Sequence, residues 1–338
     1  MASVKRVKLP FASGLTIEFT DRERALDQVR EFAEKGTPYP VVVYGPEGCG
    51  KTAWLLQAVE VFRELGFSVV YFNPLRRSFL IEVGVRSVEE RVREILKQFL
   101  SEHELAKLVW IVIDIARDAI RFGRRRLAVI VDDAFQFTGA YSATLFVKGL
   151  LELIEHPVEE YERIVAIAAT SEGLSRREIG RHRWANTMSM WNMSRSGFEE
   201  LYERIPGEKP PFEDVWRLAG GNPDALRRLY QAKWDAEVVI DRLLREREIT
   251  PSFINAWRSW LEKAVEDPDA LWNPGAPREL VNELIAKNLV VYNMYERRGV
   301  FWVDEPPPEK DPELGVGRYV AWQTPLHREA VRRSLKEF

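Results

Sequence analysis

The amino-acid sequence predicts an α/β fold in which a parallel sheet is followed by a helical region and by a C-terminal helix with a hairpin. Over residues 1–195, short apolar runs alternate with segments of helical periodicity, which favours a parallel sheet covered by helices on both faces. Runs of strand length then stop, and residues 196–265 carry helical periodicity. Residues 266–338 combine a helix with two short apolar runs, so we expect three domains with these boundaries.

The first part of the chain can be assigned element by element from the spacing of its apolar residues. Residues 23–34 place apolar side chains on one helical face and predict an amphipathic helix. The apolar run Val41–Tyr44, a glycine-rich stretch and a helical segment then predict strand, loop and helix. The pattern repeats, and we expect strands over residues 68–72, 127–131 and 164–169, and helices over residues 87–121 and 142–155.

The last part of the chain has the order of elements that is typical of a winged helix. A helical segment over residues 277–288 leads into the apolar run Leu289–Tyr292. The turn Arg297–Gly299 then leads into a second apolar run, Val300–Val303, and two such runs around a short turn predict a hairpin. Residues 304–317 are dense in proline and acidic residues and are expected to form a loop.

The charge balance gives no sign of a dominant partner. The 338 residues include 49 basic and 52 acidic side chains, a formal net charge of −3, so binding to nucleic acid or to a membrane would need a local patch. The single cysteine, Cys49, excludes an internal disulfide, and the first residues contain no apolar run of signal-peptide or membrane-span length. We expect a cytoplasmic protein that makes no membrane contact.

Residues 45–52 match the pattern G-x-x-x-x-G-K-[ST] in full, directly after a predicted strand and at the start of a predicted helix. Glycines let backbone N–H groups curl around phosphate oxygens, and a helix N-terminus adds positive potential. We expect Lys51 to neutralise the β- and γ-phosphates of ATP and the Thr52 hydroxyl to ligate Mg²⁺. The predicted ATP-binding residues are Gly45, Pro46, Glu47, Gly48, Cys49, Gly50, Lys51 and Thr52.

Two carboxylates, Asp132 and Asp133, follow the apolar run Leu127–Val131. They would lie at the C-terminal end of a strand, where α/β sheets place their ligands. We expect Asp132 to hold Mg²⁺ through water and Asp133 to polarise the attacking water as a catalytic residue. An acidic turn after a buried strand is the structural alternative, and the phosphate-binding loop makes it the weaker one.

A hydroxyl and a basic cluster follow the next predicted strand. Thr170 comes directly after the run Ile164–Ala169 and would face the γ-phosphate from the same sheet edge. The cluster beyond it either supplies an arginine to a phosphate in a neighbouring subunit, which requires a homo-oligomer, or lies on a solvated helix. The candidate arginines are Arg177, Arg181 and Arg183.

Taken together in this order, five segments resemble the archaeal ATPases of the AAA+-like, signal-transducing group of P-loop NTPases. These segments are Phe19–Glu23, VVVYGPEGCGKT, AVIVDDAFQF, AATSEG and Gly220–Pro223. The resemblance covers most of the chain and implies an ATPase core, a helical lid and a terminal winged helix.

The resemblance also implies roles for single residues. Phe19–Glu23 would lie near the adenine, Thr170 would be the sensor threonine that takes part in catalysis, and Pro223 with the two residues before it would place the lid against the nucleotide. The sequence departs from the family at Asp133, where glutamate is usual, and at Ser171–Glu172, where the family commonly continues Gly-Ser.

The residues therefore predict ATP binding with Mg²⁺-dependent hydrolysis, and they leave open what the ATP cycle drives. Association with double-stranded DNA is one hypothesis, because the expected winged helix is rich in basic residues. A nucleotide-controlled, protein-binding switch with slow turnover is the alternative, and the acidic residues 304–313 favour it. Nucleotide binding with negligible turnover is a third. The basic residues are Arg278, Lys287, Arg297, Arg298, Arg328, Arg332, Arg333 and Lys336.

Overall fold

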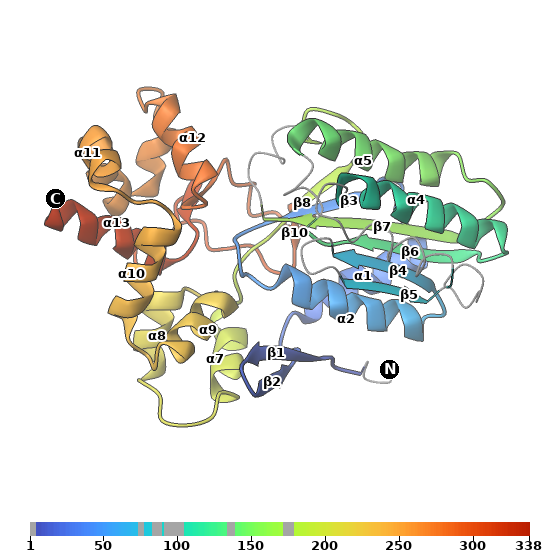
Figure 1. Cartoon of the computed structure of the whole chain (residues 1–338), viewed down its shortest axis with the longest axis horizontal. Helices are drawn as coiled ribbons and strands as arrows, with labels where there is room; N and C mark the ends of the chain where they lie inside the picture. The colour runs from blue at the N-terminus through green and yellow to red at the C-terminus, as the bar shows by residue number, and fades with distance from the viewer. Residues whose placement is uncertain (1–4, 74–77, 83–89, 91–104, 134–138, 172–178) are drawn as a thin grey trace. The chain divides into compact units, whose positions relative to one another are not determined.

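The computed structural model describes residues 5–73, 78–82, 90, 105–133, 139–171 and 179–338 (Figure 1). The chain divides into two compact units, each of which combines segments that are far apart in the sequence. Unit 1 comprises Met1–Val7, Glu23–Tyr44 and Lys51–Met188, and unit 2 comprises Lys8–Arg22, Gly45–Gly50 and Ser189–Phe338. The three domains expected from the sequence stay a prediction.

Unit 1 is built on a mostly parallel sheet, which confirms the predicted α/β fold. Its strands lie in the order β8-β3-β7-β6-β4-β5. Strand β3 pairs in parallel with β7, β7 with β6 and β6 with β4, whereas β5 pairs antiparallel with β4. The strands are β3 (Val41–Tyr44), β4 (Ser68–Asn73), β5 (Ser78–Glu82), β6 (Arg126–Val131), β7 (Arg163–Thr170) and β8 (Asn186–Met190).

Helices cover both faces of this sheet (Figure 1). On one face, α4 (Leu105–Arg121) packs against α5 (Gly139–Glu155) and over strands β4 and β6. On the other face, α1 (Glu23–Lys35) packs against α2 (Lys51–Glu64), which contacts β4. Both faces are apolar because the central strands are continuous apolar runs, as parallel strands between two helical layers require. Every side chain from Leu127 to Val131 is 0% exposed.

The apolar runs located the buried strands of unit 1, but strands without such runs were missed. The predicted strand Val41–Tyr44 coincides with β3, and β4, β6 and β7 extend the other predicted runs by one or two residues. The edge strand β5 and the polar strand β8 have no comparable signal in the sequence. Of the predicted helix over 87–121, residues 87–89 and 91–104 lie outside the described residues.

Unit 2 is mainly helical. Its helices pack around one core, in which Phe198, Leu226, Ile254 and Trp322 are fully buried. An N-terminal hairpin, β1 (Lys8–Ala12) with β2 (Leu15–Glu18), also belongs to this unit. The helices are α7 (Arg195–Glu203), α8 (Phe212–Ala219), α9 (Pro223–Gln231), α10 (Ala236–Glu246), α11 (Pro251–Glu266), α12 (Arg278–Ala286) and α13 (Pro325–Glu337), with 3₁₀ turns at Pro268–Trp272 and Gly299–Phe301.

Local signals set where these helices begin and end. The Asn222 side chain caps α9 by accepting the Ala225 N–H, and Pro223 fills the first turn, where a missing N–H costs nothing. The long helical pattern after residue 223 breaks into α9 and α10 because Lys233 and Trp234 adopt left-handed φ values of 54° and 66°.

The hairpin predicted near the C-terminus is wrong. Strand β9 (Val290–Tyr292) pairs antiparallel with β11 (Val320–Trp322), and β10 (Trp302–Val303) instead pairs in parallel with the last residues of β8, Ser189 and Met190. Two apolar runs of similar length follow β9 in the sequence, Val300–Val303 and Val320–Trp322. The second run forms β11 and pairs with β9, whereas Trp302 and Val303 of the first run are 0% exposed and pair with β8. A winged helix in this region stays a prediction.

Among the described residues, no helix combines the length and the apolar character that crossing a membrane would require.

Candidate functional site

The C-terminal edge of the sheet in unit 1 gathers several of the predicted site residues. The register pairs Tyr44 at the end of β3 with Thr170 at the end of β7, and pairs Val131 at the end of β6 with Ala168. Thr170 and Asp132 therefore lie at one edge of the sheet, and both are 0% exposed. Lys51 begins α2 in the same unit and is 5% exposed.

Asp132 presents a buried carboxylate with one oxygen unpaired. Its Oδ2 accepts hydrogen bonds from Asn73 Nδ2 at 2.8 Å and from the Tyr71 hydroxyl at 3.1 Å. Its Oδ1 has no hydrogen-bond partner among the described residues. Because an unpaired buried carboxylate oxygen costs free energy, this atom fits a ligand that brings positive charge. Carboxylate and hydroxyl oxygens suit Mg²⁺, so Asp132 and Thr52, which lies in the first turn of α2, fit such an ion.

Asp133 has an unusual backbone. Its φ of 50° lies in the left-handed region, which residues other than glycine rarely adopt, and Asn73 Nδ2 lies 3.4 Å from its carboxylate. Such outliers persist where surrounding structure enforces them, and they cluster at functional sites. The segment that follows, residues 134–138, lies outside the described residues.

The glycine-rich loop, residues 45–50, is tightly enclosed within unit 2. A Cβ on Gly45 would lie 2.0 Å from the carbonyl oxygen of Met190, so no side chain fits there. Gly48 has a φ of 76°, and a Cβ on it would lie 2.2 Å from the Cβ of Asp224. Gly45 therefore requires glycine because a backbone carbonyl approaches it closely, and Gly48 requires it for its left-handed φ and for its close contact with the Asp224 side chain.

Successive carbonyl groups of this loop accept hydrogen bonds from residues that are distant in the sequence. In a curled loop the N–H groups face inward only if the carbonyl groups turn outward, and outward carbonyls that are buried need donors. The donors are Arg22, near the N-terminus, and two residues at the start of α9. They are Asn222 Nδ2 to Glu47 O at 2.9 Å, Asp224 N to Gly48 O at 3.3 Å and Arg22 Nη2 to Cys49 O at 2.7 Å.

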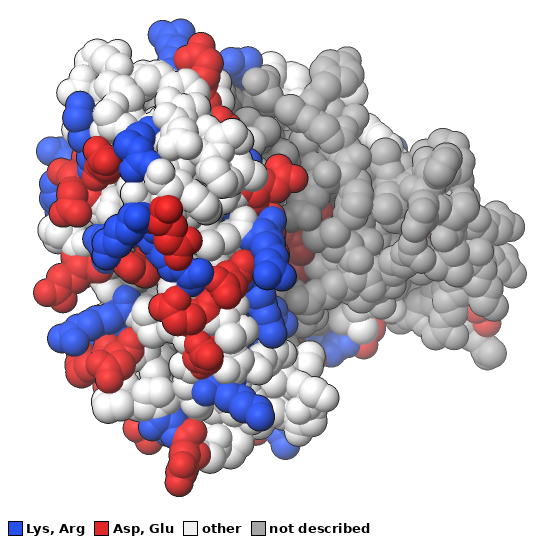
Figure 2. All heavy atoms as spheres, turned by 60° about the vertical axis from the view of Figure 1, so that its left-hand side comes forward, with Lys and Arg blue, Asp and Glu red and all other residues white. Residues whose placement is uncertain are grey.

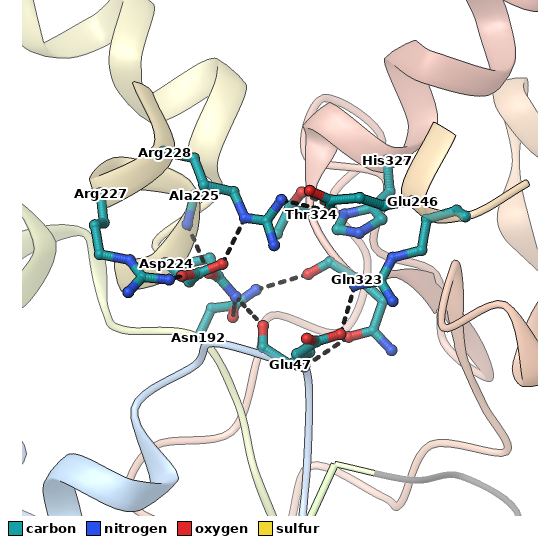
Figure 3. A network of polar contacts seen from close by, with 12 residues as sticks. Glu47, Asn192, Asp224, Ala225, Arg227, Arg228, Glu246, Gln323, Thr324 and His327 are labelled. Atoms are coloured by element: carbon teal, nitrogen blue, oxygen red, sulfur yellow. Dashed lines mark hydrogen bonds and ion pairs between the residues drawn. The ribbon is translucent and has the colours of Figure 1, made fainter. Parts of the chain in front are cut away.

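Glu47 connects the loop to the C-terminal part of unit 2 (Figure 3). Its backbone N–H donates to Gln323 Oε1 at 2.9 Å, and its carboxylate forms an ion pair with Arg247. The neighbouring Asn192 accepts from Asn222 Nδ2 at 2.8 Å and donates to the Gln323 carbonyl at 3.1 Å. The loop therefore contacts side chains that lie between α10 and α11 and before α13, and Asn192, before α7, joins Asn222 to Gln323 beside it.

A small polar cavity of about 20 Å³ lies within this network in unit 2. A volume of this size admits about one water molecule. His327 lines it, and burial together with the nearby Arg247 and Arg228 lowers the pKa of His327 to about 3. The imidazole is therefore neutral at physiological pH, with Nδ1 2.8 Å from the Thr324 hydroxyl and Nε2 without a partner among the described residues.

Asp224 and Arg228 form a charged pair beside the same cavity (Figure 3). Arg228 Nε donates to Asp224 Oδ2 at 2.7 Å, and its Nη1 donates to Glu246 Oε2 at 2.6 Å. Burial alone would raise the pKa of Asp224, but the hydrogen bonds and charges of Arg228 and Arg227 hold it below its ordinary value. Asp224 is therefore ionised, and its carboxylate is already occupied by arginine.

Pro223 and the candidate arginines are the remaining predicted site residues. Pro223 lies beside the loop, since a Cβ on Gly50 would lie 4.0 Å from Pro223 Cγ. Of the candidate arginines, Arg181 and Arg183 are exposed on unit 1, whereas Arg177 lies outside the described residues.

No motif in the sequence indicated Asn192, Arg247, Gln323 or His327. Each is a single polar residue with no motif around it. Arg247, Gln323 and His327 reach the loop or its cavity only through the folding of unit 2, and Asn192 reaches Asn222 and Gln323 in the same way. Arg22 and Asn222 were singled out through their segments, but their bonds to loop carbonyls were not foreseen.

The sequence model of one protein family, described as an ATPase domain predominantly from Archaea, matches residues 19–229. A curated relative, Replication factor C small subunit 2 from Pyrobaculum islandicum, is 25% identical over 232 residues, which cover 68% of this chain and 68% of that protein.

Similar solved structures include the ORC2 protein of Aeropyrum pernix in ADPNP and ADP complexes, which is 14% identical with a TM-score of 0.40 and is matched over 79% of this chain and 68% of its own. They also include AMPPCP-bound DnaA from Aquifex aeolicus, which is 13% identical with a TM-score of 0.37 and is matched over 77% of this chain and 74% of its own.

The neutral state of His327 predicts a pH dependence of stability. The pKa of His327 in the folded state lies below the ordinary value of about 6.5, so the unfolded state binds a proton more readily than the folded state. The free energy of unfolding therefore decreases as the pH falls from 6.5 toward 3. Between pH 8 and pH 5, the free energy of unfolding should therefore decrease by about 2 kcal/mol less in His327→Asn than in the wild type.

Urea unfolding at the two pH values measures this loss. The matched control is His156→Asn, which changes an exposed histidine of unit 1 and should leave the pH dependence of the wild type intact. Equal pH dependence in the His327 variant and the wild type would contradict the assignment of a neutral buried imidazole.

Proposed function

The chain belongs to the family of ATPase domains found predominantly in Archaea, and on this basis we propose that it binds ATP and hydrolyses it with Mg²⁺. The observation that carries the proposal is the loop at residues 45–50, whose carbonyl groups at 47, 48 and 49 all accept hydrogen bonds from outside the loop. With these carbonyl groups held, we expect the N–H groups of Gly48 and Gly50 and the N-terminus of α2 to face phosphate oxygens. The Glu47 N–H is already bonded to Gln323 Oε1.

The proposed phosphate contacts lie on one continuous segment. Gly45, Pro46, Glu47, Gly48, Cys49 and Gly50 would surround the phosphates, and Lys51 would neutralise the charge of the β- and γ-phosphates. Pro223, next to Gly50, would pack against the nucleotide at the end of the loop.

The residues of unit 1 supply the proposed chemistry. Thr52 and Asp132 would hold Mg²⁺, which when bound withdraws charge from the phosphate oxygens. Asp133 would accept a hydrogen bond from the attacking water and orient it for in-line attack. The Thr170 hydroxyl, buried at the same sheet edge as Asp132, would donate to the γ-phosphate.

The basic residues expected to bind DNA are largely engaged within unit 2. The Arg297 guanidinium donates to the carbonyls of Tyr295, Pro308 and Gly317, and that of Arg328 donates to the carbonyls of Pro312 and Glu313. Arg333 pairs with three carboxylates, and Lys287 with two. On the described face drawn in Figure 2, Lys and Arg are interspersed with Asp and Glu, so this face presents no continuous cationic patch for DNA.

A nucleotide-controlled switch has better support as the second function. The loop residue Glu47 is bonded to Gln323 and Arg247, which belong to the C-terminal part of unit 2. A ligand that changes the position of Glu47 would change these bonds, and a ligand shifts a conformational equilibrium by its differential contacts with the two states. We therefore favour a protein partner over DNA.

Two substitutions separate binding from hydrolysis. Lys51→Ala should weaken the binding of a fluorescent ATP analogue about 10- to 100-fold, because a charged donor to the phosphates is lost. Asp133→Asn should retain that affinity and lower turnover about a hundredfold or more, because only the orientation of water is lost.

Matched controls accompany both variants. Lys35→Ala removes an exposed lysine at the end of α1 and should bind and turn over like the wild type. Asp133→Glu keeps the carboxylate and should retain turnover. If Lys51→Ala and Asp133→Asn both hydrolyse ATP at the wild-type rate, the proposed ATPase site is wrong.

The preference for a protein partner makes a prediction about DNA. Turnover measured across a salt series should be the same with and without duplex DNA, because most of the basic side chains expected to bind DNA already pair with carboxylates or backbone carbonyls. Stimulation that falls steeply with salt, and that is reduced in Arg298→Ala, where an exposed arginine is lost, would instead establish DNA association.

The candidate arginines make a prediction about assembly. If an arginine acts on the nucleotide of a neighbouring subunit, Arg181→Ala or Arg183→Ala should lower turnover with little change in nucleotide affinity. Mixing that variant with Lys51→Ala protein should then restore part of the activity, because each supplies what the other lacks. The absence of rescue in protein shown by light scattering to oligomerise would exclude a shared site for these residues.

A further inference from the structure

Arg22 is a buried cation whose donors are divided between a carboxylate and two backbone carbonyls of unit 2. It is 2% exposed, and its Nη1 donates to Asp304 Oδ2 at 2.8 Å. Its Nη2 donates to the carbonyl of Cys49 at 2.7 Å and to that of Trp191 at 3.0 Å. One guanidinium therefore joins the glycine-rich loop to a carboxylate that follows β10.

The pairing of β10 with β8 explains how Asp304 reaches Arg22. Trp302 pairs with Ser189 and Val303 with Met190 in parallel register. The next residues along the two segments are Asp304 and Trp191, and both accept hydrogen bonds from the same guanidinium. A two-residue strand thus delivers a carboxylate to a cation that comes from the other end of the sequence.

This arrangement is costly, and stability alone does not account for it. Arg22 and Asp304 both have left-handed φ values, 68° and 67°, and neither is a glycine. Asp304 is 5% exposed, so both charges have been removed from water. A buried ion pair is often no more stabilising than apolar residues of similar volume, so its presence here points to a positioning role.

The carbonyl that Arg22 holds belongs to the same peptide group as the N–H of Gly50. The C=O and N–H of a trans peptide point in opposite directions, so fixing the Cys49 carbonyl also fixes the direction of the Gly50 N–H. Gly48 and Gly50 flank this position with φ values of 76° and 104°. Because glycine has no Cβ, its backbone adopts many conformations, so these residues alone do not keep the peptide group in one orientation. The loop therefore depends on an external donor to keep this N–H in one direction.

We propose that Arg22 is a positioning residue for nucleotide binding, and that Asp304, held by the pairing of β10 with β8, keeps it in place. The proposal rests on the proposed function, because the Gly50 N–H is taken to bind a phosphate. It adds that nucleotide affinity depends on the segment around Asp304: separation of β10 from β8 leaves Arg22 without its carboxylate, releases the Cys49 carbonyl and weakens the binding of ATP.

The test compares substitutions of Asp304 in the full chain. Asp304→Asn should weaken the binding of a fluorescent ATP analogue with Mg²⁺ by about tenfold or more, because the cation that holds the loop loses its partner. Asp304→Glu keeps the charge and should recover part of this affinity. Glu309→Gln, which changes an exposed carboxylate five residues further along the same segment, should bind like the wild type.

A second variant separates positioning from folding. Arg22→Met combined with Asp304→Leu removes both buried charges together, so it should lower the melting temperature less than a variant that leaves one of the two charges buried alone, and it should remain folded. It also removes the donor to the Cys49 carbonyl, so its affinity for the ATP analogue should still fall by about tenfold. Wild-type affinity in this folded double variant would overturn the proposal.

The only cysteine gives a measurement that does not depend on ATP. Cys49 is 0% exposed, so its reaction with a thiol reagent in the absence of nucleotide reports opening of the loop. Labelling should be about tenfold faster in Asp304→Asn and in the double variant than in the wild type or Glu309→Gln. Unchanged labelling would overturn the proposed tether, whereas a wild-type protein that binds no ATP analogue but shows the labelling difference would overturn the proposed function alone.

Discussion

A loop that presents N–H groups to a phosphate must turn its carbonyl groups away from it, and each carbonyl that becomes buried then needs a donor. In this protein the carbonyls at residues 47, 48 and 49 receive hydrogen bonds from Asn222, from the N–H of Asp224 and from Arg22. Helix α9 begins at the residue after Asn222, so one helix start both caps itself and supports the loop. Two separate parts of unit 2, Arg22 and the start of α9, are therefore tied to the loop through its carbonyl groups.

The sheet of unit 1 meets a separate constraint, that of placing polar groups at the end of a buried strand. Residues 127–131 of β6 are fully buried, and the carboxylate of Asp132 that follows them is also buried and is held by Tyr71 and Asn73. Only one of its oxygens is satisfied in this way. The parallel register of β6 with β7 brings Asp132, which follows β6, and Thr170, the last residue of β7, to the same edge of the sheet, where α/β folds place their ligands.

The sequence predicted features that depend on local pattern and failed where tertiary pairing decides. Continuous apolar runs located β3, β4, β6 and β7, because a strand buried on both faces must be apolar throughout. The pairing of β9 could not be predicted, because two apolar runs of similar length follow it and the choice between them depends on long-range contacts. The glycine-rich loop was recognised from its own residues, whereas Gln323 and Arg247 contact it only through folding.

The order of the loop is linked to the C-terminal part of unit 2 by simple thermodynamics. Glycines at 45, 48 and 50 give the isolated loop high conformational entropy, so its order must come from groups around it. Arg22 supplies one such group, and its own position is fixed by Asp304. A ligand that binds the N–H groups of the loop favours the state in which the loop carbonyls are hydrogen-bonded. Because coupling between two binding events is reciprocal, hydrogen bonding of the carbonyls favours binding of that ligand to the same extent. An occupied loop would therefore strengthen the contacts around Asp304 and Gln323, and displacement of those segments by a partner would weaken binding in the loop by the same factor.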